Sequence, residues 1–304
     1  MAALDLALDQ PIDLLATLRP LVRGQGDRTI RLRPGQAWWT VRATGGPATV
    51  VIRVLPDRVL AESFGPGAVA ALERVPDLIG AAADAASPRD LPTDSHRLVA
   101  ALARAHPGVR IPRSRAVMHA LIPAILEQKI TGDEARRAWH GLVRGLGEDA
   151  PGEAGAGLRV TPAADRLAAL PYHAYHPYGI ERRRAELIRV LAGRAAWVEG
   201  LADLPPAEAG IALLTIPGIG PWTAAEVAIR AFGDVDAVSV GDFHLPTMVA
   251  FALARESRGD DTRMLELLEP YRGHRAIVMR LLELGGPRPA RRGQRMPTRA
   301  IEGI

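Results

Sequence analysis

The stretch of sequence that decides the fold runs from residue 213 to residue 245, LLTIPGIGPWTAAEVAIRAFGDVDAVSVGDFHL. Apolar residues at helical spacing lead into Pro217, whose ring cannot continue a helix. Gly218 and Gly220 have no Cβ, so they can adopt positive φ and let another group approach the backbone closely. Pro221 suits the first turn of a new helix, expected from about residue 222 to 232. The pattern predicts two helices joined by a tight glycine turn.

A turn of this kind can bind an anion. Its free backbone N–H groups, together with those at the start of the following helix, attract negative charge. A DNA phosphate is one such anion. From the turn alone, a plain helix–turn–helix connection with no ligand is an open alternative.

Asp242 follows Gly220 by 22 residues and is expected to open a third helix. Asp is a good N-cap residue, so a structural role is one interpretation. A fixed carboxylate also stabilises the positive charge that develops on a deoxyribose when its N-glycosidic bond breaks, and it can orient or deprotonate a water. One side chain can serve both purposes.

The string IPGIGPWTA resembles the hairpin of the helix-hairpin-helix glycosylase superfamily, which is named for its hairpin, Gly-Pro-rich loop and Asp. The resemblance implies that Asp242 is catalytic. It also implies that a DNA phosphate is held by the turn and the following helix, through Gly218, Ile219, Gly220 and Thr223. A monovalent cation, Na⁺ or K⁺, is expected on the backbone carbonyls of Leu214, Ile216 and Ile219.

No other cofactor is expected. The chain contains no cysteine, which excludes the cysteine-bound iron–sulfur cluster of some relatives. Relatives that also cleave the DNA strand carry a Schiff-base lysine where this chain has Trp222. The only lysine here, Lys129, is distant from the hairpin in sequence. We therefore predict base release by water, without lyase activity.

Other segments resemble 3-methyladenine DNA glycosylase II, a family that removes alkylated bases. Residues 124–131, AILEQKIT, look like the helix and turn that carry its wedge, which implies DNA contacts from Gln128 and a wedge at Lys129. The resemblance also implies that Trp222 and Tyr271 line the base pocket. A flipped 3- or 7-methylpurine is cationic, so it stacks well on electron-rich rings.

The chain departs from that family at Glu226, where a second pocket aromatic is expected. Glu226 either faces a cationic base in the pocket or forms a salt bridge with Arg230 at i,i+4. Two other functions stay open: a glycosylase for deaminated or etheno bases, and a non-catalytic DNA-binding protein that uses the hairpin alone. A further cluster, PYHAYHPYG at residues 171–179, either stacks on bases or is a polar loop that caps a helix.

The composition sets broad limits. With 304 residues, 48% of them hydrophobic, the chain can bury one large or two medium cores. No apolar run reaches the ~18 residues of a membrane-spanning helix, and no signal-peptide pattern is present. We expect a cytoplasmic, nucleoid-associated monomer, with double-stranded DNA containing damaged bases as its partner and no membrane contact.

The expected fold class is α+β. Strands are expected at 29–33, 37–43 and 48–55. We predict a small N-terminal antiparallel sheet domain at 1–88, an all-helical helix-hairpin-helix domain at 89–286, and a disordered basic tail at 287–304. The tail holds five arginines and one glutamate, which equals the net charge of +4 of the whole chain.

Overall fold

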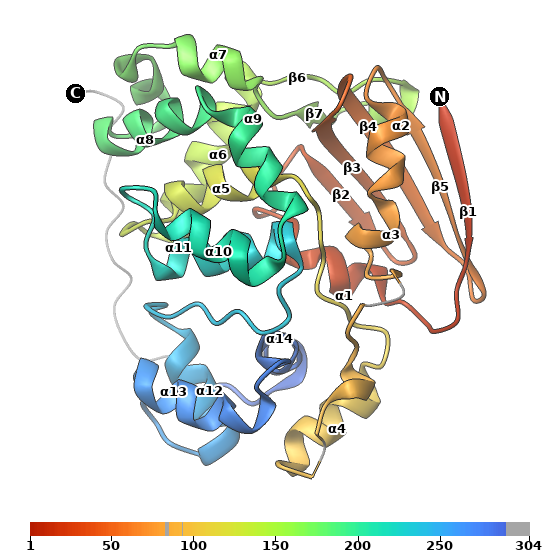
Figure 1. Cartoon of the computed structure of the whole chain (residues 1–304), viewed down its shortest axis with the longest axis vertical. Coiled ribbons are helices and arrows are strands. Elements are labelled where there is room, and N and C mark those ends of the chain that lie inside the picture. Colours follow the sequence, from red (N-terminus) through yellow and green to blue (C-terminus); the bar gives the residue numbers. More distant parts are fainter. Residues whose placement is uncertain (83–84, 93, 290–304) are drawn as a thin grey trace.

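The computed structural model describes residues 1–82, 85–92 and 94–289. A five-stranded antiparallel sheet stands beside a larger group of helices (Figure 1). This mixed architecture confirms the α+β class. The strand order is β1-β5-β4-β3-β2. The strands are β1 Ala2–Ala7, β2 Ile30–Arg33, β3 Gln36–Ala43, β4 Gly46–Val54 and β5 Arg58–Phe64. The region predicted as all-helical also contains a two-stranded antiparallel sheet, β6 Glu148–Asp149 and β7 Arg159–Val160, so that part of the prediction is wrong.

Alternation along the strands gives the sheet one apolar face, which packs against three short helices. They are α1 Leu14–Leu18, α2 Ala68–Glu73 and α3 Val75–Leu78. Helices α2 and α3 are separated at Arg74, directly before a segment with Pro76 at its second position. The edge strand β1 and its neighbour β5 were not predicted, because short strands with charged residues on one face give a weak signal.

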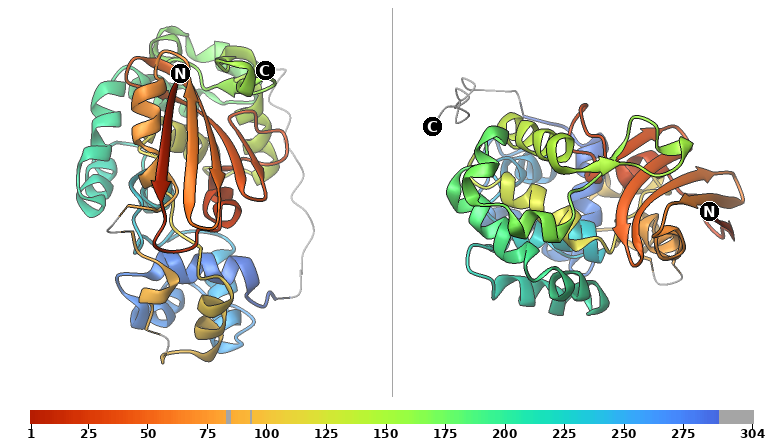
Figure 2. Two further views of the ribbon diagram at one scale, coloured as in Figure 1. Left: turned by 90° about the vertical axis from the view of Figure 1, so that its right-hand side faces the viewer. Right: turned by 90° about the horizontal axis from the view of Figure 1, so that it is seen from above.

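The remaining helices form two groups, each with its own buried core. Helices α4, α12, α13 and α14 lie at one end of the molecule, away from the hairpin helices (Figures 1 and 2). None of the described helices is both long and apolar enough to cross a membrane. The bounds are α4 Arg97–Ala105, α5 Val117–Leu126, α6 Gly132–Leu146, α7 Ala164–Ala169, α8 Arg182–Ala192, α9 Ala195–Gly200, α10 Pro206–Leu214, α11 Pro221–Val227, α12 Leu245–Ala254, α13 Asp261–Leu268 and α14 Arg275–Gly285.

Helix α5 is the central helix of the larger core, since every one of its residues except His119 is buried. Its first two amides, at Val117 and Met118, donate to the carboxylate of Glu199 on α9 at 2.9 and 3.0 Å. This contact satisfies N–H groups that a helix start leaves unpaired. The end of α5 leads directly into the turn at Gln128 and Lys129. Of the predicted basic tail, residues 290–304 lie outside the described residues.

His119 joins the sheet to the helices. Its ring lies between Trp39 of β3 and Trp139 of α6, at centroid distances of 6.5 and 5.7 Å. The Nε2 atom lies 3.2 Å from the Thr29 hydroxyl, while the buried Nδ1 has no hydrogen-bond partner within the described part of the chain. Burial disfavours the charged ring and lowers the pKa of His119 to about 4.

We predict that His119 makes the free energy of unfolding decrease as the pH is lowered. The unfolded chain takes up the proton near pH 6.5, whereas the folded protein resists it down to about pH 4, so stability is lost as the pH drops through this window. Between pH 7 and pH 5 the loss is roughly 2 kcal/mol. Urea unfolding at both pH values measures it. His119→Gln, which cannot titrate, is the control and should remove most of the difference; an unchanged difference would contradict the assignment.

Candidate active site

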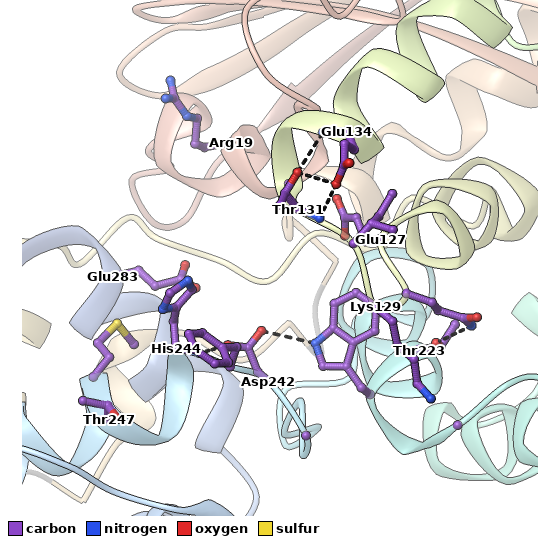
Figure 3. A pocket seen from close by; sticks show the side chains of 18 of the residues that line it. Arg19, Glu127, Lys129, Thr131, Glu134, Thr223, Asp242, His244, Thr247 and Glu283 are labelled. Carbon is purple, nitrogen blue, oxygen red and sulfur yellow. Dashed lines mark hydrogen bonds between the residues drawn. The ribbon is translucent and has the colours of Figure 1, made fainter. Parts of the chain in front are cut away.

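A large cleft of about 2970 Å³ runs between the hairpin, the sheet domain and the second helical group. Segments far apart in the sequence meet on its walls: α1, the turn after α5, the hairpin, the loop before α12, and α14 (Figure 3). Of the twelve candidate residues, eight line this cleft, and Leu214, Ile216, Glu226 and Tyr271 do not.

The hairpin forms as predicted. Helix α10 ends at Leu214, and α11 begins at Pro221 with Gly220 as its N-cap. Gly218 has φ of 97°, the left-handed conformation that favours glycine. The expected single helix up to residue 232 is α-helical only to Val227 and then continues as one π-helical turn.

The hairpin is braced from the turn after α5. The side-chain amide of Gln128 donates to the Gly218 carbonyl and to the Thr223 hydroxyl, both at 3.0 Å. Thr223 is only 2% exposed. The Gln128 amide therefore supports the hairpin, and both residues also line the cleft, so their contacts with DNA stay predictions.

Lys129 directly follows this brace and lines the cleft. Its φ is 55°, so the backbone turns sharply here. Figure 3 shows its side chain extending past Thr223 and away from Asp242. The lysine is thus remote from the hairpin in sequence but next to it in space.

Asp242 is held by three N–H groups. Its Oδ1 atom accepts from the backbone amides of His244 and Leu245 at 2.7 and 2.8 Å, and its Oδ2 atom accepts from the Trp222 indole N–H at 3.2 Å. Helix α12 begins three residues later than predicted, at Leu245, because the Asp242 side chain satisfies the free amides at that end. The N-cap residue is His244, and Asp242 stabilises this helix start from two residues earlier by accepting from the His244 and Leu245 amides. The same half-buried carboxylate lines the cleft beside Trp222 (Figure 3).

Two predicted pocket residues do not lie on the cleft wall. Glu226 bonds to Arg230 at 2.7 Å and accepts from the Ser239 hydroxyl at 2.7 Å, so the salt-bridge alternative is correct. Tyr271 is 1% exposed and packs in the core of the second helical group, where burial raises its pKa to about 12. In this structure neither side chain reaches the described cleft wall, because Glu226 is bound by Arg230 and Ser239 and Tyr271 is packed in the core.

Sequence reasoning missed an aromatic side chain of the cleft. Phe243, next to Asp242, is 88% exposed, and its ring stands edge-on to the His244 ring at 4.9 Å. A large apolar side chain so exposed in a cleft is typical of a binding surface. No sequence pattern separates it from a core phenylalanine.

The cleft also has a set of arginines that make no ion pair with any described residue. They come from five different segments of the chain, and only Arg183 stands in a run of basic residues, at 182–184. The set is Arg19, Arg137, Arg183, Arg258 and Arg288.

The Tyr/His cluster divides between core and surface. Tyr175 is fully buried and donates its hydroxyl to the Leu167 carbonyl at 2.6 Å. The Arg182 guanidinium covers the Tyr172 ring at 4.6 Å. Tyr178 and Gly179 line the cleft wall.

The backbone carbonyls predicted for a cation are compatible with one. Ile216 accepts from the Ile219 amide at 3.0 Å, whereas in the described part of the chain no amide donates to Leu214 or Ile219. Carbonyl oxygens with free lone pairs are ligands that hard cations prefer. These residues fit a monovalent ion.

The chain is similar to known DNA repair proteins. Over 224 residues it is 30% identical to a protein of Mycobacterium tuberculosis described as "probable bifunctional transcriptional activator/DNA repair enzyme AlkA"; this covers 70% of the chain and 43% of that protein. The chain thus spans less than half the length of the curated relatives it matches. No family model matches it.

The fold is similar to that of solved glycosylases. A 3-methyladenine DNA glycosylase of Archaeoglobus fulgidus has a TM-score of 0.75 at 19% identity, covering 93% of this chain and 98% of that one. An 8-oxoguanine glycosylase/lyase of Clostridium acetobutylicum has a TM-score of 0.67 at 12% identity, covering 93% and 96%. The chain thus has the fold of these DNA glycosylases, and its sequence is similar to that of a described DNA repair enzyme. Both findings agree with the resemblance to the helix-hairpin-helix glycosylase superfamily, near the 3-methyladenine enzymes.

The two turn glycines allow a matched test of the hairpin geometry. In Gly218→Ala, positive φ and a methyl group 3.1 Å from Leu187 both oppose folding. We expect a loss of about 1–2 kcal/mol in the free energy of unfolding. In Gly220→Ala, φ is −96° and no heavy atom lies within 4 Å of the new Cβ, so stability should hardly change. Denaturant unfolding compares them, and equal losses would contradict this geometry.

Proposed function

We propose that this protein is a DNA glycosylase that removes alkylated purines of the 3-methyladenine type from duplex DNA and leaves an abasic site for base excision repair. The observation that supports this most is the fixed Asp242 carboxylate beside Trp222, in a cleft that is also lined by the glycine turn of the hairpin. The chemistry that follows from these groups has three steps: binding, flipping and hydrolysis.

Binding depends on backbone and charge. The amides at Gly218, Ile219 and Gly220 would hold one phosphate, helped by a monovalent cation on the carbonyls of Leu214, Ile216 and Ile219. The unpaired arginines of the cleft would neutralise further phosphates. Such contacts do not distinguish bases, so we expect little sequence preference. One chain supplies every group, which suits a monomer.

Flipping requires groups that replace the base in the stack and hold it outside. Lys129 stands at the wedge position, and its methylene stem can fill the space while its ammonium group reaches a phosphate. Trp222 and the exposed Phe243 offer rings to the flipped base. A cationic methylpurine gains most from such rings.

Hydrolysis then uses Asp242. Alkylation gives the purine a positive charge and makes it a good leaving group, so the step mainly needs stabilisation of the developing positive sugar and a positioned water. A carboxylate ~4 Å from that charge contributes roughly 4 kcal/mol at an effective dielectric of ~20. Trp222 stands where strand-cleaving relatives have lysine, and Lys129 extends away from Asp242. The proposed enzyme therefore has no lyase activity and requires no redox cofactor.

The test of this function is base release from methylated duplex DNA by the wild type and by Asp242→Asn. We expect intact abasic strands from the wild type and at least about a hundred-fold loss in the variant, since roughly 4 kcal/mol corresponds to about three decades of rate. DNA binding should persist, because the asparagine Oδ1 can still accept from His244 and Leu245.

Other outcomes would lead to other conclusions. Full activity of Asp242→Asn would contradict the catalytic assignment. Release of deaminated or etheno bases, but not of methylated purines, would support the other lesion class. Binding without release from any lesion would indicate a hairpin module that only binds DNA.

Two adjacent arginines test the electrostatic part of DNA binding. Arg183 lines the cleft and has no ion-pair partner among the described residues, whereas Arg182 covers the Tyr172 ring and does not line the cleft. Arg183→Ala should weaken binding and reduce the slope of log K against log salt by about 1. Arg182→Ala, the matched control, should leave the slope unchanged. A titration of labelled duplex at several salt concentrations measures both, and identical slopes for all three proteins would contradict the assignment.

A further inference from the structure

Two carboxylates hold the loop that carries Asp242. The Glu226 Oε1 atom accepts from the Ser239 hydroxyl at 2.7 Å. Two residues further along the chain, the Gly241 amide donates to both oxygens of Asp261, at 3.1 and 3.0 Å. The loop is thus fixed on either side of Val240, from α11 on one side and from α13 on the other.

The loop needs such support. Gly241 has φ of 92°, and glycine has the greatest backbone freedom of all residues. The Asp242 amide donates back to the Ser239 carbonyl at 3.2 Å, so a shift at Ser239 moves Asp242 directly. Without the two carboxylates, the Gly241 amide and the Ser239 hydroxyl would have no partner among the described residues.

Neither carboxylate is placed to touch a ligand. Glu226 and Asp261 are absent from the residues that line the cleft. Glu226 is held in place by Arg230 at 2.7 Å. Asp261 is not the N-cap of α13, because Asp260 fills that role by accepting from the Arg263 amide at 2.8 Å. The contact from Asp261 to Gly241 is therefore separate from helix capping.

We propose that Glu226 and Asp261 are positioning residues, which hold the 239–242 loop so that the Asp242 carboxylate faces the reacting sugar. This inference rests on the proposed function. It also gives Glu226 a role at the position where the family resemblance places a pocket aromatic. A displacement of about 1 Å in a catalytic group costs about a hundred-fold in rate, so the loss of either contact is measurable.

The kinetic test compares Asp261→Ala with Asp260→Ala. Asp261→Ala should lower kcat for base release at least about ten-fold with little change in KM, because DNA binding does not use this residue. Asp260→Ala, which loses the cap of the same helix, should retain a kcat near that of the wild type. Asp261→Asn should recover part of the loss, since its amide oxygen still accepts from Gly241. Equal losses in the two alanine variants would overturn the proposal.

Glu226 is tested in the same way. Glu226→Gln keeps an oxygen that can accept from Ser239 but removes the charge that pairs with Arg230, whereas Glu226→Ala removes both contacts. We expect a larger loss of kcat in the alanine variant. If both variants match the wild type in kcat, Glu226 is not a positioning residue.

Hydrogen exchange separates this proposal from the proposed function. In Asp261→Ala, the amides of residues 239–245 should exchange faster than in the wild type, and in Asp260→Ala they should not. This readout does not require any glycosylase activity. Faster exchange in a protein that releases no base would support the positioning role and contradict the proposed function, whereas unchanged exchange would overturn the positioning role.

Discussion

Burial of two isoleucines fixes the hairpin on which the whole cleft depends. Ile216 and Ile219 flank Gly218, and each is only 6% exposed in the larger helical core. Side chains packed at this density hold the backbone that carries them. The carbonyl that receives Gln128 and the start of α11 therefore have fixed positions. The turn after α5 and the indole that donates to Asp242 are placed by the same buried turn.

A rigid support suits the chemistry that we propose. Electrostatic stabilisation of a developing charge depends on a group that does not have to reorganise during the reaction. Three N–H groups fix the Asp242 carboxylate, and two of them are backbone amides at the start of α12. The capping role and the proposed catalytic role thus support each other, because the cap fixes the direction of the carboxylate.

The sequence could predict the features that depend only on residues close together in the chain. Proline and glycine act within a few residues, so the hairpin and the approximate start of the helix after Asp242 could be predicted from neighbours alone. Contacts over long sequence distances could not: the Gln128 amide reaches Gly218 across 90 residues, and Tyr271 is buried by helices from both halves of the chain. The exposure of Phe243 depends on the fold as a whole, so no local pattern indicated it.

Helix α11 contacts the 239–242 loop at both of its ends. Trp222 and Glu226 lie one turn apart on α11, and the first donates to Asp242 while the second accepts from Ser239. Since one rigid turn of helix sets the distance between these two contacts, the loop has little freedom to slide along α11. An aromatic residue in place of Glu226 would have no carboxylate to accept the hydrogen bond from the Ser239 hydroxyl. Where the resemblance implies a pocket aromatic, this chain thus has a carboxylate that accepts from Ser239, in the loop before Asp242.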